Sequence, residues 1–196
     1  MPQFGKFFAN LLAIAVLGIG GGLGSAWYMV EAGSRLSTKS FGPWSTWVAA
    51  GRPDADPYTR AHAARNALLP IASTLELTYY AKTDGEGAQL QSACDYTVTV
   101  DGLEGAWWSL AAFDRKGGLF ANMADRYAFS SDTAMREPDG RAVIVLARDS
   151  RPGNWLPVGA GKVTLVLTVQ DAVMAAAVST GGPAKALPAI RKIGCR

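Results

Sequence analysis

A single histidine limits the acid–base chemistry available to this chain of 196 residues. His62 is therefore the only imidazole that can serve a Ser-His-Asp triad. Arg60 and Arg65 flank it, and two cations oppose the imidazolium that a general base must form. A metal site made of several histidines cannot be built from this chain alone. We expect His62 to pack on a helix surface or against a sheet. We expect no catalytic residue, no metal ligand and no cofactor.

The two cysteines, Cys94 and Cys195, belong to no Cys-x-x-Cys motif and to no Cys/His cluster. Cys94 begins a segment with strand periodicity, and Cys195 lies at the C-terminal end of the sequence. A disulfide that ties down this end is useful only in an oxidising compartment. We therefore expect a bond between the two sulfur atoms. The alternatives are two unrelated buried thiols, or a nucleophilic Cys94 with a base beside it.

Aromatic side chains are the most suggestive candidates for a binding site. Trp107 and Trp108 are adjacent in a predicted strand, so they face opposite sides of the sheet. Trp108 is in phase with Leu110 and is expected in the core, which leaves Trp107 on the other face. Exposed aromatics beside Arg and Asn can stack on a sugar ring or an apolar partner surface. The predicted binding residues are Trp107, Arg126, Asn154 and Trp155. The alternative is that all of these aromatics pack against the predicted helix at 57–69 or seal the ends of the sandwich.

Alternation of apolar and polar residues predicts the elements that position these side chains. Val163, Leu165, Leu167 and Val169 keep a strict period of two, which indicates one buried strand face. Similar short runs recur from residue 75 to residue 170, with turn signals between them. The Asp56-Pro57 pair predicts the start of a short helix over about 57–69. We expect a mainly β fold, an antiparallel jelly-roll-like β-sandwich with a short helix, preceded by one transmembrane helix.

The segment 7–30 carries no charge. As a helix it is roughly 36 Å long, enough to cross a hydrocarbon core of about 30 Å. The sequence therefore predicts a cytoplasmic tail over 1–6, a transmembrane signal anchor over 7–30, a linker over 31–55 and a β-sandwich over 56–196. A cleaved signal peptide is the alternative, because small residues at 24–26 offer a cleavage site.

Five glycines lie between residues 18 and 24. In lipid, small residues four apart let two helix backbones approach closely. Gly18 and Gly22 have this spacing, and so do Gly20 and Gly24. Gly18 and Gly22 are the predicted contact with another helix, and a loosely packed single span is the alternative. The expected partners are the membrane, through residues 7–30, and a membrane protein or a second copy of the chain. The net charge of +3 argues against nucleic acid.

Several motifs together resemble one bacterial family over residues 55–196. In chain order they are DPYTRA, YYAKTDGEGAQL, WWSLAAFDRKGGLFAN, DRYAFSSDT, DGRAVIVLARDSRPGNWLPVG and LPAIRKIGC. This combination is similar to the proteins grouped as domain of unknown function 1214, in its short membrane-anchored branch. The resemblance implies a jelly-roll-like β fold and a frequent neighbour with a companion domain (1254). It implies no established reaction.

These features favour a non-catalytic binding or assembly subunit of a cell-envelope complex. We expect a single pass through the bacterial inner membrane, with the C-terminal domain in the periplasm. The alternative is an envelope enzyme or accessory protein that acts on glycan or lipid. Such an enzyme would use two turn carboxylates at the separations seen in glycosidases.

Overall fold

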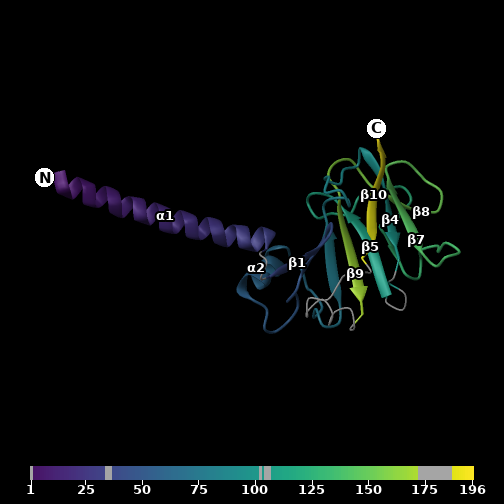
Figure 1. Cartoon of the computed structure of the whole chain (residues 1–196), viewed down its shortest axis with the longest axis horizontal. Coiled ribbons are helices and arrows are strands. Elements are labelled where there is room, and N and C mark those ends of the chain that lie inside the picture. Colours follow the sequence, from purple (N-terminus) through teal and green to yellow (C-terminus); the bar gives the residue numbers. More distant parts are fainter. Residues whose placement is uncertain (1, 34–36, 102, 104–106, 172–186) are drawn as a thin grey trace.

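A computed structural model describes residues 2–33, 37–101, 103, 107–171 and 187–196, with side chains described from residue 5 onward. A long N-terminal helix projects from a β-rich body (Figure 1). This helix, α1 (Pro2–Ala32), has 31 residues, which makes it about 46 Å long. Its segment Gly5–Ala32 is long and apolar enough to cross a membrane, and its most apolar window is 0% buried. The apolar helix expected over 7–30 is confirmed.

The strands form two sheets. The larger sheet is antiparallel throughout, in the order β1 (Thr38–Phe41), β2 (Trp44–Trp47), β3 (Leu77–Ala81), β9 (Thr164–Gln170), β5 (Trp107–Phe113) and β6 (Ala128–Ser130). The smaller sheet has the order β10 (Ala189–Cys195), β4 (Cys94–Val100), β7 (Ala142–Ala147) and β8 (Asn154–Pro157).

One strand pair departs from the antiparallel expectation. β8 runs parallel to β7, with Ile144 opposite Asn154. Residues 148–153 run back from the end of β7 to the end of the sheet where Ile144 lies, and β8 begins there. No local sequence pattern predicts this connection. The fold is therefore mainly β, with one antiparallel sheet and one mixed sheet.

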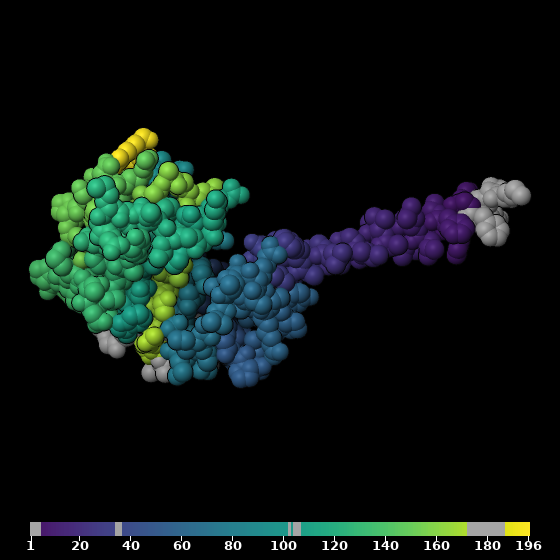
Figure 2. Space-filling view, turned by 180° about the vertical axis from the view of Figure 1, so that it is seen from behind, coloured from purple at the N-terminus to yellow at the C-terminus, as the bar shows by residue number. Residues whose placement is uncertain are grey.

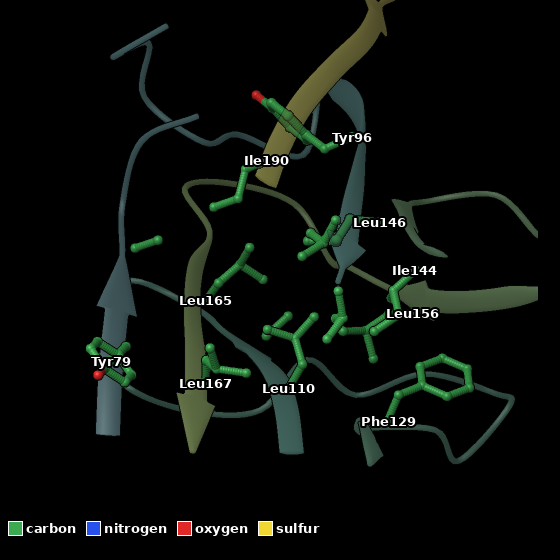
Figure 3. Close-up of a cluster of buried hydrophobic side chains, with 14 of the residues drawn as sticks. Tyr79, Tyr96, Leu110, Phe129, Ile144, Leu146, Leu156, Leu165, Leu167 and Ile190 are labelled. Carbon is green, nitrogen blue, oxygen red and sulfur yellow. The ribbon is translucent and has the colours of Figure 1, made fainter. Parts of the chain in front are cut away.

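Both sheets contribute to one hydrophobic core. Figure 3 shows Leu110, Leu165 and Leu167 of the larger sheet pointing towards Ile144, Leu146 and Leu156 of the smaller one. The alternation predicted for β9 and β4 is confirmed, since every second side chain in both strands is buried. The orientation predicted for the two tryptophans of β5 is also confirmed, because Trp108 is buried and Trp107 is exposed.

Part of the expected linker 31–55 belongs to the larger sheet. β1 and β2 form a hairpin there, and β2 pairs with β3. Trp44 and Thr46 are both buried, and the hydroxyl of Thr46 donates to the carbonyl of Thr78 at 2.8 Å. A buried polar residue interrupts the apolar alternation, which is why the strand pattern is hidden in the sequence. The prediction of a linker is wrong for residues 38–47.

The short helix begins where the sequence predicts. α2 (Pro57–Arg65) has Asp56 as its N-cap, whose carboxylate accepts hydrogen bonds from the backbone N–H groups of Tyr58 and Thr59, both at 3.0 Å. The helix ends earlier than expected. Ala67 has φ of +51°, and this left-handed conformation cannot continue a right-handed helix.

The cysteine pair is bonded. The disulfide joins Cys94 to Cys195 across a sequence separation of 101 residues. The two cysteines are direct partners in the β4–β10 ladder. The end of the chain, which the sequence predicts as a pinned tail, is therefore a paired strand. From residue 173 the sequence predicts a short helix or extended run ahead of this strand, and up to residue 186 that segment lies outside the described residues.

Candidate functional site

The structure brings two of the four predicted binding residues together. The guanidinium of Arg126 donates to the backbone carbonyl of Trp155 at 3.2 Å and lies 5.4 Å from the ring centroid of Phe129. Trp155 lies in β8 rather than in a loop, and its indole N–H donates to the carbonyl of Ala147 at 3.0 Å. The polar atoms of this pair thus serve the packing of β8 against its neighbours.

Asn154 has its side chain fully used inside the fold. Its amide oxygen accepts from the N–H of Met135 at 2.7 Å, and its amide nitrogen donates to the carbonyls of Met135 and Val143 at 2.8 and 3.0 Å. The residue is 5% exposed. Asn154 therefore acts as a buried bridge between segments, which is a structural role.

Trp107 lies away from the other three residues. It is 39% exposed, and its indole N–H donates to a carboxylate oxygen of Asp132 at 3.0 Å. Trp107 starts β5, whereas Arg126 precedes β6, which pairs with β5 from Ser109 onward. A strand of this length spans about 20 Å. The four residues therefore do not converge on one site.

The turn carboxylates are mostly committed to ion pairs or loop hydrogen bonds. Asp95 lies 2.5 Å from the guanidinium of Arg151, and Asp149 lies 2.5 Å from that of Arg196. The hydrogen bond with Arg196 lowers the pKa of Asp149. Within the described part of the chain, no group of three His, Cys, Asp or Glu side chains is placed to hold a metal ion.

A cluster of side chains joins α1 to the β domain. We call it the α1 joint: Trp27, Val30, Trp47, His62 and Arg65. The Nδ1 atom of His62 lies 2.8 Å from the carbonyl oxygen of Val30. The imidazole of His62 stacks on Trp47, with ring centroids 4.1 Å apart. The sequence indicated a packing role for His62, which this contact confirms, but it did not indicate the partners.

Arg65 completes the α1 joint from the last turn of α2. Its guanidinium lies 3.9 Å from the ring centroid of Trp27, and its Nε atom lies 3.3 Å from a carboxylate oxygen of Glu31. A cation over an indole contributes roughly 0.5–1 kcal/mol where water reaches the pair. Sequence reasoning missed this contact because its two residues are 38 positions apart and share no periodic pattern.

Residues in the described part of the chain line hollows on the β domain. One, of about 230 Å³, is next to the α1 joint and is lined by residues that include Trp47, Leu68, Ile71 and Tyr80. A second, of about 600 Å³, lies between the β1–β2 turn, residues 84–86 and β10.

Asp84, at the edge of the second hollow, is 2% exposed. Its Oδ1 atom accepts from the N–H groups of Glu86 and Ala88 at 3.0 and 2.9 Å. Its Oδ2 atom is buried and receives no hydrogen bond from the described residues.

Comparisons with known proteins bear on the fold and on the family of the chain. The VPA0106 protein from Vibrio parahaemolyticus has 14% sequence identity and a TM-score of 0.62 to this chain, covering 94% of this chain and 46% of its own. A second structure, of an uncharacterized protein from Burkholderia cenocepacia, has 18% identity and a TM-score of 0.39, covering 62% of this chain and 30% of its own. The chain thus spans less than half the length of either protein. None of the curated proteins matches it.

The first likeness shows a shared fold, and the family follows from the sequence. Residues 76–173, half of the chain, match the family model described as "Protein of unknown function (DUF1214)". This range runs from the start of β3 to the end of β9 and includes most of the core strands. The chain therefore belongs to the DUF1214 family.

Proposed function

We propose that this chain is a membrane-anchored, non-catalytic binding or assembly subunit of a bacterial cell-envelope complex, in the short membrane-anchored branch of its family. α1 crosses the inner membrane once, and the β domain, a jelly-roll-like sandwich, lies in the periplasm. The α1 joint is the observation that carries the proposal. An apolar helix whose most apolar stretch is unburied is fastened directly to a folded domain.

The disulfide supports an exported domain. The Cys94–Cys195 bond closes a loop of 101 residues. Disulfides persist in oxidising compartments, such as the periplasm, and are rare in the cytosol. An exported domain attached to an N-terminal apolar helix is consistent with a short cytoplasmic tail over residues 1–6.

The glycines of α1 supply the assembly surface. A Cβ atom added at Gly18 or Gly22 would meet nothing within 4 Å, so this helix face is open within the chain. Small residues at this spacing let a second helix approach closely. The partner is therefore a membrane protein or a second copy of this chain, bound through α1.

The test compares two substitutions on α1 of the full chain in a mild detergent. Gly22→Leu fills the proposed contact face. Gly20→Leu makes the same chemical change about 200° around the helix from Gly18. We expect Gly22→Leu to weaken assembly several-fold, because the leucine side chain keeps the two helix backbones from approaching closely.

The measured quantity is the amount of partner that is cross-linked to the chain or purified with it. It is followed while added detergent lowers the concentration of the chain in the micelles. Gly20→Leu should assemble like the unchanged chain. A monomer without partner for the unchanged chain, or equal recovery for both variants, would contradict assembly through this face.

A further inference from the structure

The segment after α2 exposes consecutive apolar side chains. We call residues 67–71 the apolar loop; its sequence is Ala-Leu-Leu-Pro-Ile. Leu69 is 98% exposed and Ile71 is 48% exposed. Leaving one such side chain in water rather than buried costs roughly 1.5–3 kcal/mol. A run of this kind marks an interaction surface or a folding liability.

The apolar loop is held in this position from both ends. The N–H of Leu68 donates to the carbonyl of Ala63 at 2.9 Å, and the N–H of Ser73 donates to the carbonyl of Ala50 at 2.9 Å. In its middle, the loop backbone packs tightly on Gly51, where an added Cβ would lie 2.6 Å from the carbonyl oxygen of Pro70. These contacts hold the backbone of the chain on both sides of Leu69.

The contacts of the α1 joint determine where the apolar loop lies along the axis of α1. Arg65, the last residue of α2, contacts Trp27. Trp27 precedes Val30, the end of the uncharged segment, by about 4.5 Å of helix rise. The end of α2 is therefore beside the last turn of the proposed membrane span. The loop starts two residues later, and Figure 2 shows the blue part of the chain, which includes it, bordering the base of α1.

The neighbouring charges suit a membrane surface. α2 contains two arginines, Arg60 and Arg65, and no acidic residue; Arg65 also pairs with Glu31 of α1. Cations next to a lipid surface are attracted to anionic headgroups, by about 1 kcal/mol each. Aromatic residues such as Trp27 and Tyr28 favour the same layer of the bilayer.

We propose that the apolar loop inserts into the interfacial layer of the bilayer that α1 crosses, so that the domain contacts the membrane at two points. This inference rests on the proposed function, because it needs α1 as the anchor. Two contacts restrict rotation of the β domain about α1 and hold one face of it towards the membrane.

The test places a nitroxide label in the full chain, reconstituted in vesicles of phosphatidylethanolamine and phosphatidylglycerol. Leu69→Cys reports on the loop. Leu17→Cys reports on α1. Met123→Cys is the matched control, because Met123 is a fully exposed apolar residue near β6, at the far edge of the larger sheet from β1. The native cysteines are disulfide-bonded and take no label.

The measured quantity is the accessibility of each label to oxygen, which concentrates in lipid, relative to a water-soluble nickel chelate. We expect a ratio several-fold higher for Leu69 and Leu17 than for Met123. A lipid-like value at Leu17 with a water-like value at Leu69 overturns loop insertion and leaves the anchor intact. A water-like value at Leu17 overturns the anchor and the inference with it. Low accessibility of Leu69 to both reagents indicates a protein contact and overturns insertion into lipid.

Discussion

The β domain holds α1 and β10 in different ways. The described contacts of α1 come from side chains in the α1 joint, together with the ion pair between Arg65 and Glu31. β10 is held by a backbone ladder along β4 and by the Cys94–Cys195 disulfide. Arg196 adds an ion pair with Asp149.

Because of this difference, the stability of the β domain as a whole and the attachment of α1 to it depend on different contacts. The backbone ladder is lost only when the sheet itself opens, and the disulfide is broken only by reduction. Side-chain contacts contribute about 1 kcal/mol each, so α1 and α2 can detach while both sheets stay folded. We therefore expect changes at β10 to affect the whole domain, and changes at the α1 joint to affect only its surroundings.

The largest effect is expected at the disulfide. Cys195→Ser should lower the free energy of unfolding by about 4–5 kcal/mol, because the bond closes a loop of 101 residues in the unfolded chain. Urea unfolding of the full chain in detergent, followed by tryptophan fluorescence, measures the loss. The reduced unchanged chain should unfold at the same urea concentration as the variant. An unchanged midpoint for Cys195→Ser would show that β10 is held by its ladder alone.

The strand content was predictable where one side of a strand faces the core. Every second residue of β4 and β9 is buried, so the period of two is visible in the sequence. β10 shows no such pattern, since Ile190 is its one buried side chain. Its position comes from pairing with β4, which local sequence does not reveal.

Contacts between side chains that are far apart in the sequence were less predictable than the strands. The indole N–H of Trp44 donates to the carbonyl of Pro188, 144 residues away, at 2.8 Å. Arg126 likewise meets Trp155 across 29 residues. Such contacts depend on the order of strands in the sheets. The outward face of Trp107 was predictable, because adjacent residues of a strand alternate sides.

A smaller and more local effect is expected at Trp47. Trp47→Ala removes the ring that stacks on His62 and should lower the free energy of local opening by roughly 2 kcal/mol, because the indole is only half-buried. Amide hydrogen exchange should then accelerate in α2 and stay unchanged in β4. Trp107→Ala, at the start of β5, is the control and should leave exchange in α2 unchanged. Equal acceleration in α2 and β4 would mean that the α1 joint and the sheets open together.

The smallest effect is expected at the start of α2. Asp56→Ala should destabilise the helix by about 1 kcal/mol through loss of the N-cap. Burial acts to raise the pKa of Asp56, but hydrogen bonds from Thr59 and Tyr58 outweigh it and lower this pKa. The carboxylate therefore stabilises the folded state above about pH 4, its ordinary range, and this contribution is lost as the pH falls below it.

Hydrogen exchange in α2 at several pH values checks this prediction. The unchanged chain should lose protection in α2 at acidic pH, and Asp56→Ala should lose less. Asp139→Ala is the control, since Asp139 is a carboxylate with a lowered pKa that pairs with Arg141, next to β7 and not in α2. The same acid response in Asp56→Ala as in the unchanged chain would assign the effect to another group.

The pairing of β4 with β10 also imposes an order on synthesis. The ribosome adds Cys195 101 residues after Cys94, which takes roughly 5–20 s at 5–20 residues per second. During this interval β4 lacks its partner on one side, and an unpaired strand edge is a template for aggregation with other chains. Each unfinished chain therefore lacks the strand that covers this edge of β4 until β10 has been made.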